Sequence, residues 1–207
     1  MPLPASMPMI VLAECSLLPH ALLPLYIFEP RYRQMLAYAL EHDRVFCVGT
    51  LMGVDDEPED PAECDEAIDS YSCAGLIRAS VTHPDGTSRL ILQGVQRVRF
   101  TRWIQREPFR IASVERIKTQ VADPARARQQ AQELVDLTRS KLVVGTPAEA
   151  HFDQQIGSLE DPEIIADAIG AHFLRRACEK QALLAMDRLE DRLDFLMMKM
   201  RHCPPVR

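Results

Sequence analysis

Several sequence features that carry enzyme chemistry are missing from this chain of 207 residues. No glycine is followed by lysine, so the glycine-rich phosphate loop of ATPases is absent. The motifs G-x-S-x-G and H-E-x-x-H, which place a serine nucleophile or a zinc ion, are absent as well. Ser140 and Lys141 are neighbours in a predicted helix, where adjacent side chains point apart, so they predict no catalytic dyad. We therefore predict a protein without catalytic residues.

Long apolar runs and cysteine pairs are missing too. No window reaches the roughly 18 apolar residues that are needed to cross a bilayer. A secretory signal requires a basic residue near the N-terminus, and this chain has none before Arg31. None of the six cysteines forms a C-x-x-C pair, and the six histidines do not cluster with them. We predict free thiols, a cytoplasmic location, and no metal site or cofactor. The net charge of −6 disfavours binding to nucleic acid or to an anionic membrane.

The first 120 residues have the composition and alternation of short β-strands. One helix, beginning at Pro30, interrupts them. Because several short strands need to bury one face each, this pattern predicts a small, partly closed barrel. The six predicted strands cover residues 9–15, 22–28, 44–52, 71–84, 88–100 and 109–118.

Proline and glycine constrain individual strands. Pro24 restricts its strand to a sheet edge, a bulge or the start of a strand, because proline donates no ladder hydrogen bond. Asp85-Gly86 predicts a hairpin turn between the fourth and fifth strands. Gly94, in the middle of the fifth strand, predicts a bulge or bend.

The helix after the second strand has a clear local signature. Proline at its first position needs no N–H donor, and Glu29 before it interacts favourably with the helix dipole. Its apolar face follows helical spacing and consists of Tyr32, Met35, Leu36, Ala39 and Leu40.

Helical signals dominate after residue 120. Asp123-Pro124 and Asp161-Pro162 are typical helix starts, with aspartate as N-cap and proline at the first position. Asp187 with Glu190 predicts a capping box for the last helix. That helix carries an apolar stripe, from which we predict self-association as a homodimer; the stripe consists of Leu189, Leu193, Leu196, Met197 and Met200.

Three segments resemble a known family. The stretch "LLPHALLPLYIFEPRYRQMLAYAL" (17–40) resembles the signature of the N-terminal substrate-binding domain of the Lon protease family, including its standalone bacterial members. The strand "LILQGVQRVRF" (90–100) resembles the family's glycine-then-arginine strand, and 161–174 with 179–198 resemble its helical portion. The chain departs from the family at Pro19-His20, where Pro-Gly is common.

This resemblance implies an α+β fold. Residues 1–120 are expected to form a PUA-like pseudo-β-barrel of about six strands with one early helix. Residues 121–207 are expected to form a C-terminal helical bundle. The resemblance also implies a non-enzymatic role in recognising unfolded or tagged polypeptide, with clients passed to a separate protease.

The leucine-rich loop before the second strand is our candidate for polypeptide contact, because a binder of unfolded chains needs exposed apolar surface. For its leucines the alternative is core packing, and for the two arginines after it the alternative is an ion pair that stabilises the corner. The predicted contact residues are Leu17, Leu18, His20, Leu22, Leu23, Arg31 and Arg33.

Two other functions stay open from the sequence. Eight basic residues between Arg89 and Lys118, with Trp103 among them, allow an RNA-binding module on a PUA-like fold. Trp103 could instead form the wall of a small-ligand pocket in the β-rich part. An acidic run, with nine acids between Asp55 and Asp69, predicts a solvated loop and lacks the ligand spacing of a cation site.

Overall fold

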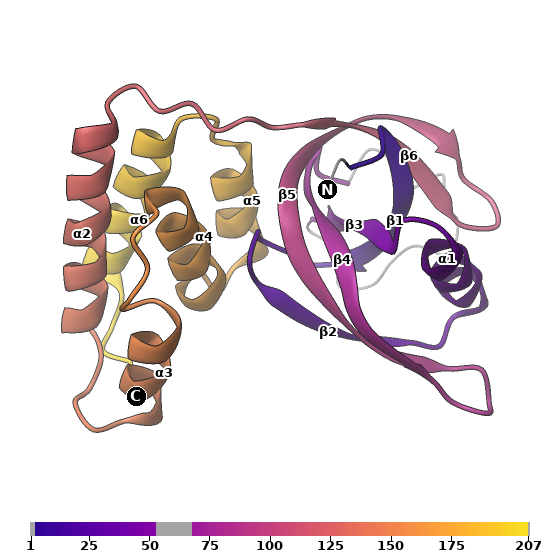
Figure 1. The fold of residues 1–207 in the computed structure, drawn as a ribbon, viewed down its shortest axis with the longest axis horizontal. Coiled ribbons are helices and arrows are strands. Elements are labelled where there is room, and N and C mark those ends of the chain that lie inside the picture. The colour runs from indigo at the N-terminus through magenta and orange to yellow at the C-terminus, as the bar shows by residue number, and fades with distance from the viewer. Residues whose placement is uncertain (1–2, 53–67, 207) are drawn as a thin grey trace. The chain divides into compact units, whose positions relative to one another are not determined.

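The computed structural model describes residues 3–52 and 68–206 of the chain, which folds into six strands and six helices over those residues (Figure 1). Almost all of the predicted acidic loop therefore lies outside the described residues. Within the described ranges, no helix combines the length and the hydropathy that crossing a bilayer requires.

The chain divides into two compact units. The first, which we call the β unit, comprises Met1–Ile117 and Arg176–Leu184. The second, the helical unit, comprises Lys118–Arg175 and Ala185–Arg207. A segment near residue 180 thus belongs with the strands, a feature that the predicted division at residue 120 does not contain.

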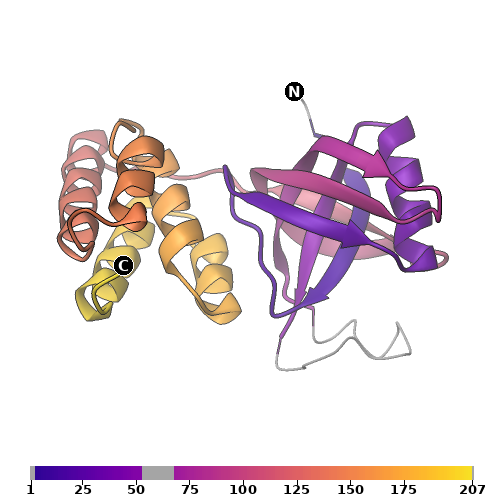
Figure 2. The ribbon, with the colours of Figure 1, turned by 90° about the horizontal axis from the view of Figure 1, so that it is seen from below.

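The β unit holds one mixed six-stranded sheet. Its strand order is β2-β5-β4-β3-β1-β6, and β6 also pairs with β5, so five strands pair in a ring and β2 lies outside it. Only the β1–β3 pair is parallel. Figure 2 shows these strands curving around a shared interior. The strands are β1 (Ser6–Ala13), β2 (Leu22–Ile27), β3 (Val45–Leu51), β4 (Tyr71–Thr82), β5 (Ser88–Gln105) and β6 (Arg110–Arg116).

The predictions from proline and glycine are confirmed. Pro24 lies in β2, which pairs with β5 alone and is an edge strand. The register between β4 and β5 shifts next to Gly94, because Gly75 faces Gly94 while Ala74 faces Gln96. A bulge at this point bends β5, which continues to Gln105 and reaches β6.

The helix α1 (Pro30–Glu41) begins at proline as predicted, and its apolar face packs beside β1 (Figure 1). Tyr32 is buried, its hydroxyl donates to Val11 O at 3.0 Å and accepts from Val11 N–H at 3.3 Å. Met35 is fully buried on the same face. The corner between β2 and α1 is therefore fastened to the first strand.

The helix α5 (Ala177–Ala185) is attached to the β unit by polar contacts. Gln181 donates to Thr50 Oγ1 at 2.6 Å and to Ser16 Oγ at 3.0 Å. The buried Arg97 donates to Leu184 O at 3.1 Å, at the last turn of the helix. These contacts join residues more than 80 positions apart, which is why sequence periodicity did not assign α5 to the strands.

The helical unit contains the other four helices: α2 (Pro124–Ser140), α3 (Pro147–Gln155), α4 (Pro162–Phe173) and α6 (Leu189–His202). Asp123 and Asp161 accept the first N–H groups of α2 and α4, as predicted. The buried Arg192 on α6 forms an ion pair with the buried Asp167 on α4. All five residues of the apolar stripe on α6 are buried within one chain, so the observation behind the homodimer prediction no longer supports it.

The predicted capping box at Asp187 is wrong. Arg188 is the N-cap residue of α6 and makes no side-chain cap. Glu190 instead accepts hydrogen bonds from the backbone N–H groups of Ala122 and Asp123, at 2.8 and 3.0 Å, directly before α2. A side chain on α6 therefore satisfies donors at the start of a different helix.

Candidate functional site

The leucine-rich loop is folded back onto the β unit. Leu17 and Leu18 are 2% and 1% exposed, so for these two residues the core alternative holds. Their segment is fastened by two backbone hydrogen bonds, from His20 N–H to Gly94 O and from Gly94 N–H to Ala21 O. Without a change of conformation, Leu17 and Leu18 offer no surface to a polypeptide.

His20 is exposed and has a φ of 65°, in the left-handed region. Glycine adopts this conformation without strain, whereas a residue with a Cβ pays for it. The chain therefore has histidine where the Pro-Gly pattern has glycine, although the backbone at His20 has a conformation that glycine adopts readily. Because its side chain is exposed, His20 stays a predicted contact residue.

The two arginines after β2 have structural partners. Arg31 pairs with Glu29 at 2.7 Å and lies over the Tyr32 ring at 4.7 Å. Arg33 packs so closely over Gly86 that a Cβ there would overlap its guanidinium group. For Arg31 the ion pair weighed as its alternative is present, whereas Arg33 lies against Gly86 in the β4–β5 turn.

That turn has its own electrostatics. The backbone N–H and the hydroxyl of Thr87 hold the pKa of Asp85 below its ordinary value, with smaller contributions from His83 and Arg33. Asp85 accepts from Thr87 N–H at 2.9 Å and from its hydroxyl at 2.7 Å. The Asp85-Gly86 hairpin predicted from the sequence is therefore an ordered turn.

An apolar face lies open on the outer side of β2, β5 and β4. Four large side chains on or beside these strands are more than half exposed: Leu22 (63%), Tyr26 (52%), Phe28 (58%) and Val81 (61%). We call this surface the outer face. Contiguous exposed apolar side chains of this kind mark binding surfaces more often than isolated ones do.

Strand register brings the outer face together. Tyr26 is opposite Arg89, which in turn is opposite Val81. In the next row, Pro24 is opposite Ile91. Because side chains of directly opposed residues lie on the same side of a sheet, these residues form two adjacent cross-strand rows.

A shallow groove of about 630 Å³ runs along these rows. The Arg89 guanidinium lies 5.9 Å from the Tyr26 ring centroid, and the Tyr26 and Phe28 rings stack at 5.8 Å. The alternate residues of β5, Ser88, Leu90 and Leu92, are buried, which confirms that Arg89 and Ile91 face outward. The groove combines aromatic and aliphatic walls with one cation.

The free edge of β2 is poorly suited to accept another strand. Gly94 N–H bonds to Ala21 O, so by the antiparallel pattern Leu23 and Leu25 also bond to β5. The backbone N and C=O of Pro24 therefore point away from β5, toward the free edge of β2. At this position the edge has no N–H to donate, because the residue is proline. Proline at an exposed edge discourages the addition of a further strand.

Sequence reasoning missed Tyr26, Phe28 and Val81 as candidate contact residues. A usable signal was present in "LLPLYIF", which is apolar at both strand parities. Because a strand of a small barrel buries only its inner face, one of the two apolar faces had no expected cover. The exposed parity is that of Leu22, Tyr26 and Phe28.

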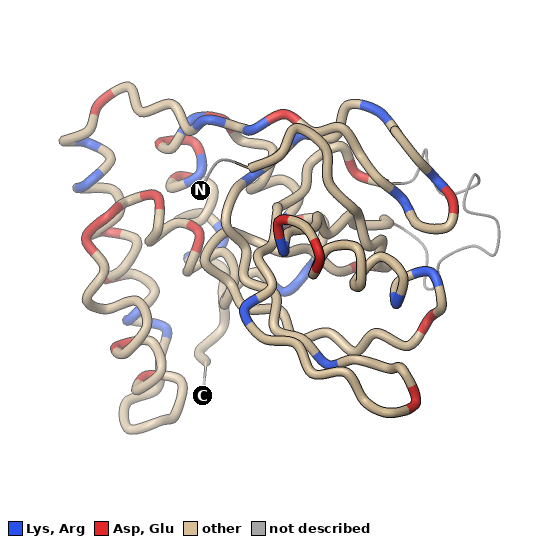
Figure 3. Tube along the Cα trace, turned by 45° about the vertical axis from the view of Figure 1, so that its right-hand side comes forward, with Lys and Arg blue, Asp and Glu red and all other residues tan. Residues whose placement is uncertain are grey.

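The basic segment from residue 89 to 118 does not form a single basic surface. Arg97 and Arg110 are buried. Arg99 pairs with Glu115 at 2.7 Å, and Arg116 donates to Leu3 O at 3.0 Å. Figure 3 shows basic residues interspersed with acidic ones along the chain. This distribution weakens the RNA-binding alternative, which needs a basic stripe with open aromatic rings.

Trp103 is engaged within the β unit. It packs against the core cluster and against the Phe100 ring, 4.5 Å between centroids, with Arg110 5.5 Å above it. These contacts account for its position without a ligand.

The cysteines of the described ranges form no disulfide. Burial raises the pKa of Cys47 to about 12 and also raises that of Cys15. Outside residues 53–67 and the chain ends, no group of three potential ligands gathers for a metal ion.

The fold is shared with solved domains from the N-termini of proteases. Residues 6–202 match the family model of the "ATP-dependent protease La (LON) substrate-binding domain", and the chain belongs to this family. It is 23% identical to the Lon protease of Escherichia coli (strain K12) over 198 residues, and 27% identical to that of Dictyoglomus thermophilum over 195 residues.

These alignments cover 93% and 92% of this chain but 24% of each protease, so the chain spans about a quarter of their length. Two solved structures share its fold. The N-terminal domain of Mycobacterium avium complex Lon protease has a TM-score of 0.73 at 14% identity, covering 95% of this chain and 98% of the domain. A Lon N-terminal domain protein from Xanthomonas campestris has a TM-score of 0.60 at 20% identity, covering 93% and 97%.

Proposed function

We propose that this protein binds unfolded polypeptide through the outer face of β2, β5 and β4. The observation that carries the proposal is the exposed apolar outer face, with Tyr26 and Val81 lining its groove, in a chain of a substrate-binding family. Unfolded chains differ from folded ones chiefly by their exposed apolar segments. A surface that recognises them needs open apolar and aromatic groups of this kind.

Binding would rest on side-chain contacts more than on strand addition. Pro24 interrupts the donors along the free edge of β2, so a client cannot complete a regular ladder there. The outer face has no such interruption, because Tyr26, Arg89 and Val81 form a continuous row across three strands. Contacts of this type tolerate many client sequences, which suits a binder of unfolded chains.

The role proposed here is recognition, without catalysis by this chain, in the context of a separate protease in the cytoplasm. Support comes from family membership and from the match, which covers the substrate-binding domain of the Lon proteases. An RNA-binding role is the second candidate, and its support is weaker because Arg97 and Arg110 are buried and Arg99 is paired with Glu115.

The test uses two valine-to-serine variants. Val81→Ser removes a 61% exposed side chain from the outer face, and Val144→Ser removes an 84% exposed side chain from the helical unit. Each is titrated with a reduced and alkylated model protein that stays unfolded. Loss of the apolar contact at Val81 should weaken binding about two- to fivefold, since burying part of a valine contributes about 0.5–1 kcal/mol. Val144→Ser should leave affinity unchanged.

Salt separates the two functions. The affinity for unfolded polypeptide should stay constant between roughly 50 and 300 mM salt, because apolar contacts depend little on salt. Over a salt range on this order, the affinity for RNA through phosphate contacts should fall by several powers of ten. Equal effects of the two valine substitutions, or no association of the unfolded protein with wild type, would contradict the proposal.

A further inference from the structure

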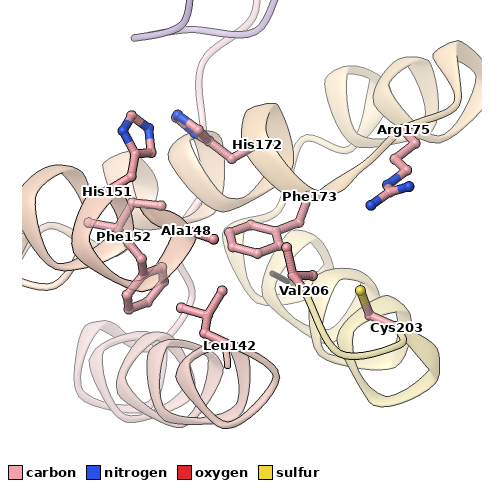
Figure 4. A pocket seen from close by; sticks show the side chains of 10 residues that line it. Leu142, Ala148, His151, Phe152, His172, Phe173, Arg175, Cys203 and Val206 are labelled. Carbon is pink, nitrogen blue, oxygen red and sulfur yellow. The ribbon is translucent and has the colours of Figure 1, made fainter. Parts of the chain in front are cut away.

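The helical unit contains a small cavity that the proposed polypeptide site does not use. Its volume is about 140 Å³, and Figure 4 shows its lining from close by. The walls come from the segment just after α2, from α3, from the last turn of α4 with the residues just after it, and from the segment after α6.

The interior of the cavity is apolar. Phe152 and Ile156 are each 1% exposed and Leu142 is 8% exposed, so their side chains are part of the packed unit. The Phe152 and Phe173 rings meet edge to face with centroids 6.3 Å apart. Cavities of about 150 Å³ lined by Leu, Ile and Phe stay dry and accept a benzene ring. This one has the volume for a ring or a branched chain of about six carbons.

The rim of the cavity carries one positive charge, that of Arg175. Arg175 is the one lining residue with a permanent charge, and no carboxylate belongs to the lining. Arg175 is exposed and forms no ion pair with other residues in the described part of the chain. In Figure 4 its guanidinium group turns back toward Cys203 at the edge of the cavity. Guanidinium matches a carboxylate with two parallel hydrogen bonds.

The other side of the rim is fixed by two histidines, His151 and His172. Their rings lie 5.1 Å apart, and His172 Nδ1 donates to Ala168 O at 2.8 Å. The last wall is the segment that ends at Val206, whose N–H donates to Lys141 O at 2.8 Å and whose carbonyl accepts from Val143 N–H at 3.0 Å. The cavity is therefore formed before any ligand arrives.

We propose that this cavity binds a small apolar monocarboxylate, with the apolar body inside and the carboxylate on Arg175. An apolar interior of this volume selects a compact hydrocarbon group, and the lone cation at the rim selects an anion over a neutral analogue. The same chemistry occurs at the C-terminus of a peptide. A cavity of about 140 Å³ accommodates a compact acid completely, whereas a peptide would leave its preceding residues outside the rim, so we assign the site to a free acid.

Phenylacetate is the probe, and phenylacetamide is the neutral analogue of the same shape. Binding is followed by amide chemical shifts of the full-length protein in NMR spectra. We expect a dissociation constant of about 1 mM for phenylacetate, as ten non-hydrogen atoms of ordinary efficiency provide. The amide should bind about fivefold more weakly. Arg175→Gln should remove this preference, and Arg176→Gln, at the neighbouring exposed arginine, should retain it.

A second pair of variants tests the cavity itself. Ala148→Leu fills the space, whereas Ala150→Leu places the same side chain on an exposed position of α3. Only Ala148→Leu should abolish the shifts. The proposal is overturned if phenylacetate causes none at about twenty times the expected constant, if the amide binds equally well, or if Ala148→Leu binds like wild type. Tighter binding by a short peptide ending in phenylalanine would overturn the assignment to a free acid.

Discussion

Replacing Gly94 by alanine should destabilise the β unit strongly. A Cβ at this position would lie 2.8 Å from the Leu18 carbonyl carbon and closer still to its oxygen. Both atoms belong to backbone that is fixed by the hydrogen bonds between Gly94 and the loop at His20 and Ala21. The overlap cannot be relieved by turning a side chain.

The size of the destabilisation follows from the contacts that are lost when the loop moves. Moving it away breaks two backbone hydrogen bonds, each worth about 1 kcal/mol net. Overpacking next to the buried Leu17 and Leu18 adds about 1–3 kcal/mol. Restriction of the unfolded chain by alanine returns less than about 1 kcal/mol. We expect Gly94→Ala to lower the free energy of unfolding by about 3 kcal/mol.

Urea denaturation followed by tryptophan fluorescence measures this change, because Trp103 is the single tryptophan and lies in the β unit. Gly49→Ala is the matched control, another glycine of the sheet. Its added Cβ would meet the flexible Met9 side chain, Sδ at 2.8 Å, so the cost should stay near 1 kcal/mol. If Gly94→Ala is no less stable than Gly49→Ala, the loop is not held as described.

Two further predictions concern His20 and Glu190. His20→Gly should raise the free energy of unfolding by about 0.5–1 kcal/mol, because glycine relieves the left-handed strain of about 1–2 kcal/mol at some entropic cost. His20→Ala, measured in the same urea titration, should not raise it. A stabilisation by alanine would refute the strain argument. Glu190→Gln should cost about 1 kcal/mol at pH 7, as a lost charged acceptor does. Hydrogen bonds, above all from Asp123 N–H, lower the folded-state pKa of Glu190, so its stabilisation is present above the unfolded value near 4.5 and is lost as pH falls through the folded value. Thermal unfolding from pH 7 to 3 should therefore show the two proteins converging at low pH, with Asp191→Asn as an exposed control; a constant difference would refute the assignment.

Local signals predicted much of the fold. Each predicted strand and the early helix exist, and Pro24, Pro30, Asp123 and Asp161 act as their chemistry requires. Such signals depend on a residue and its near neighbours in the chain. Proline lacks an N–H in any context, and an aspartate before a helix can always reach the first free N–H groups.

The exposure of the predicted site residues was harder to predict, because exposure is not a local property. Leu17 and Leu18 are as apolar as Leu22, yet the first two are buried and Leu22 is 63% exposed. The difference comes from the loop's hydrogen bonds to Gly94, a residue more than 70 positions away. No periodicity in residues 17–23 contains that information.

Sequence by itself determined the family, the order of the strands along the chain, the starts of α1, α2 and α4, and the turn at Asp85-Gly86. Tertiary structure decided which apolar residues stay exposed on the outer face, that α5 joins the strands through Gln181 and Thr50, and that Glu190 accepts hydrogen bonds from the segment before α2. The physical reason is range. Backbone preferences act over a few residues, whereas burial and polar partnership are settled by groups that only the completed fold brings within hydrogen-bond distance.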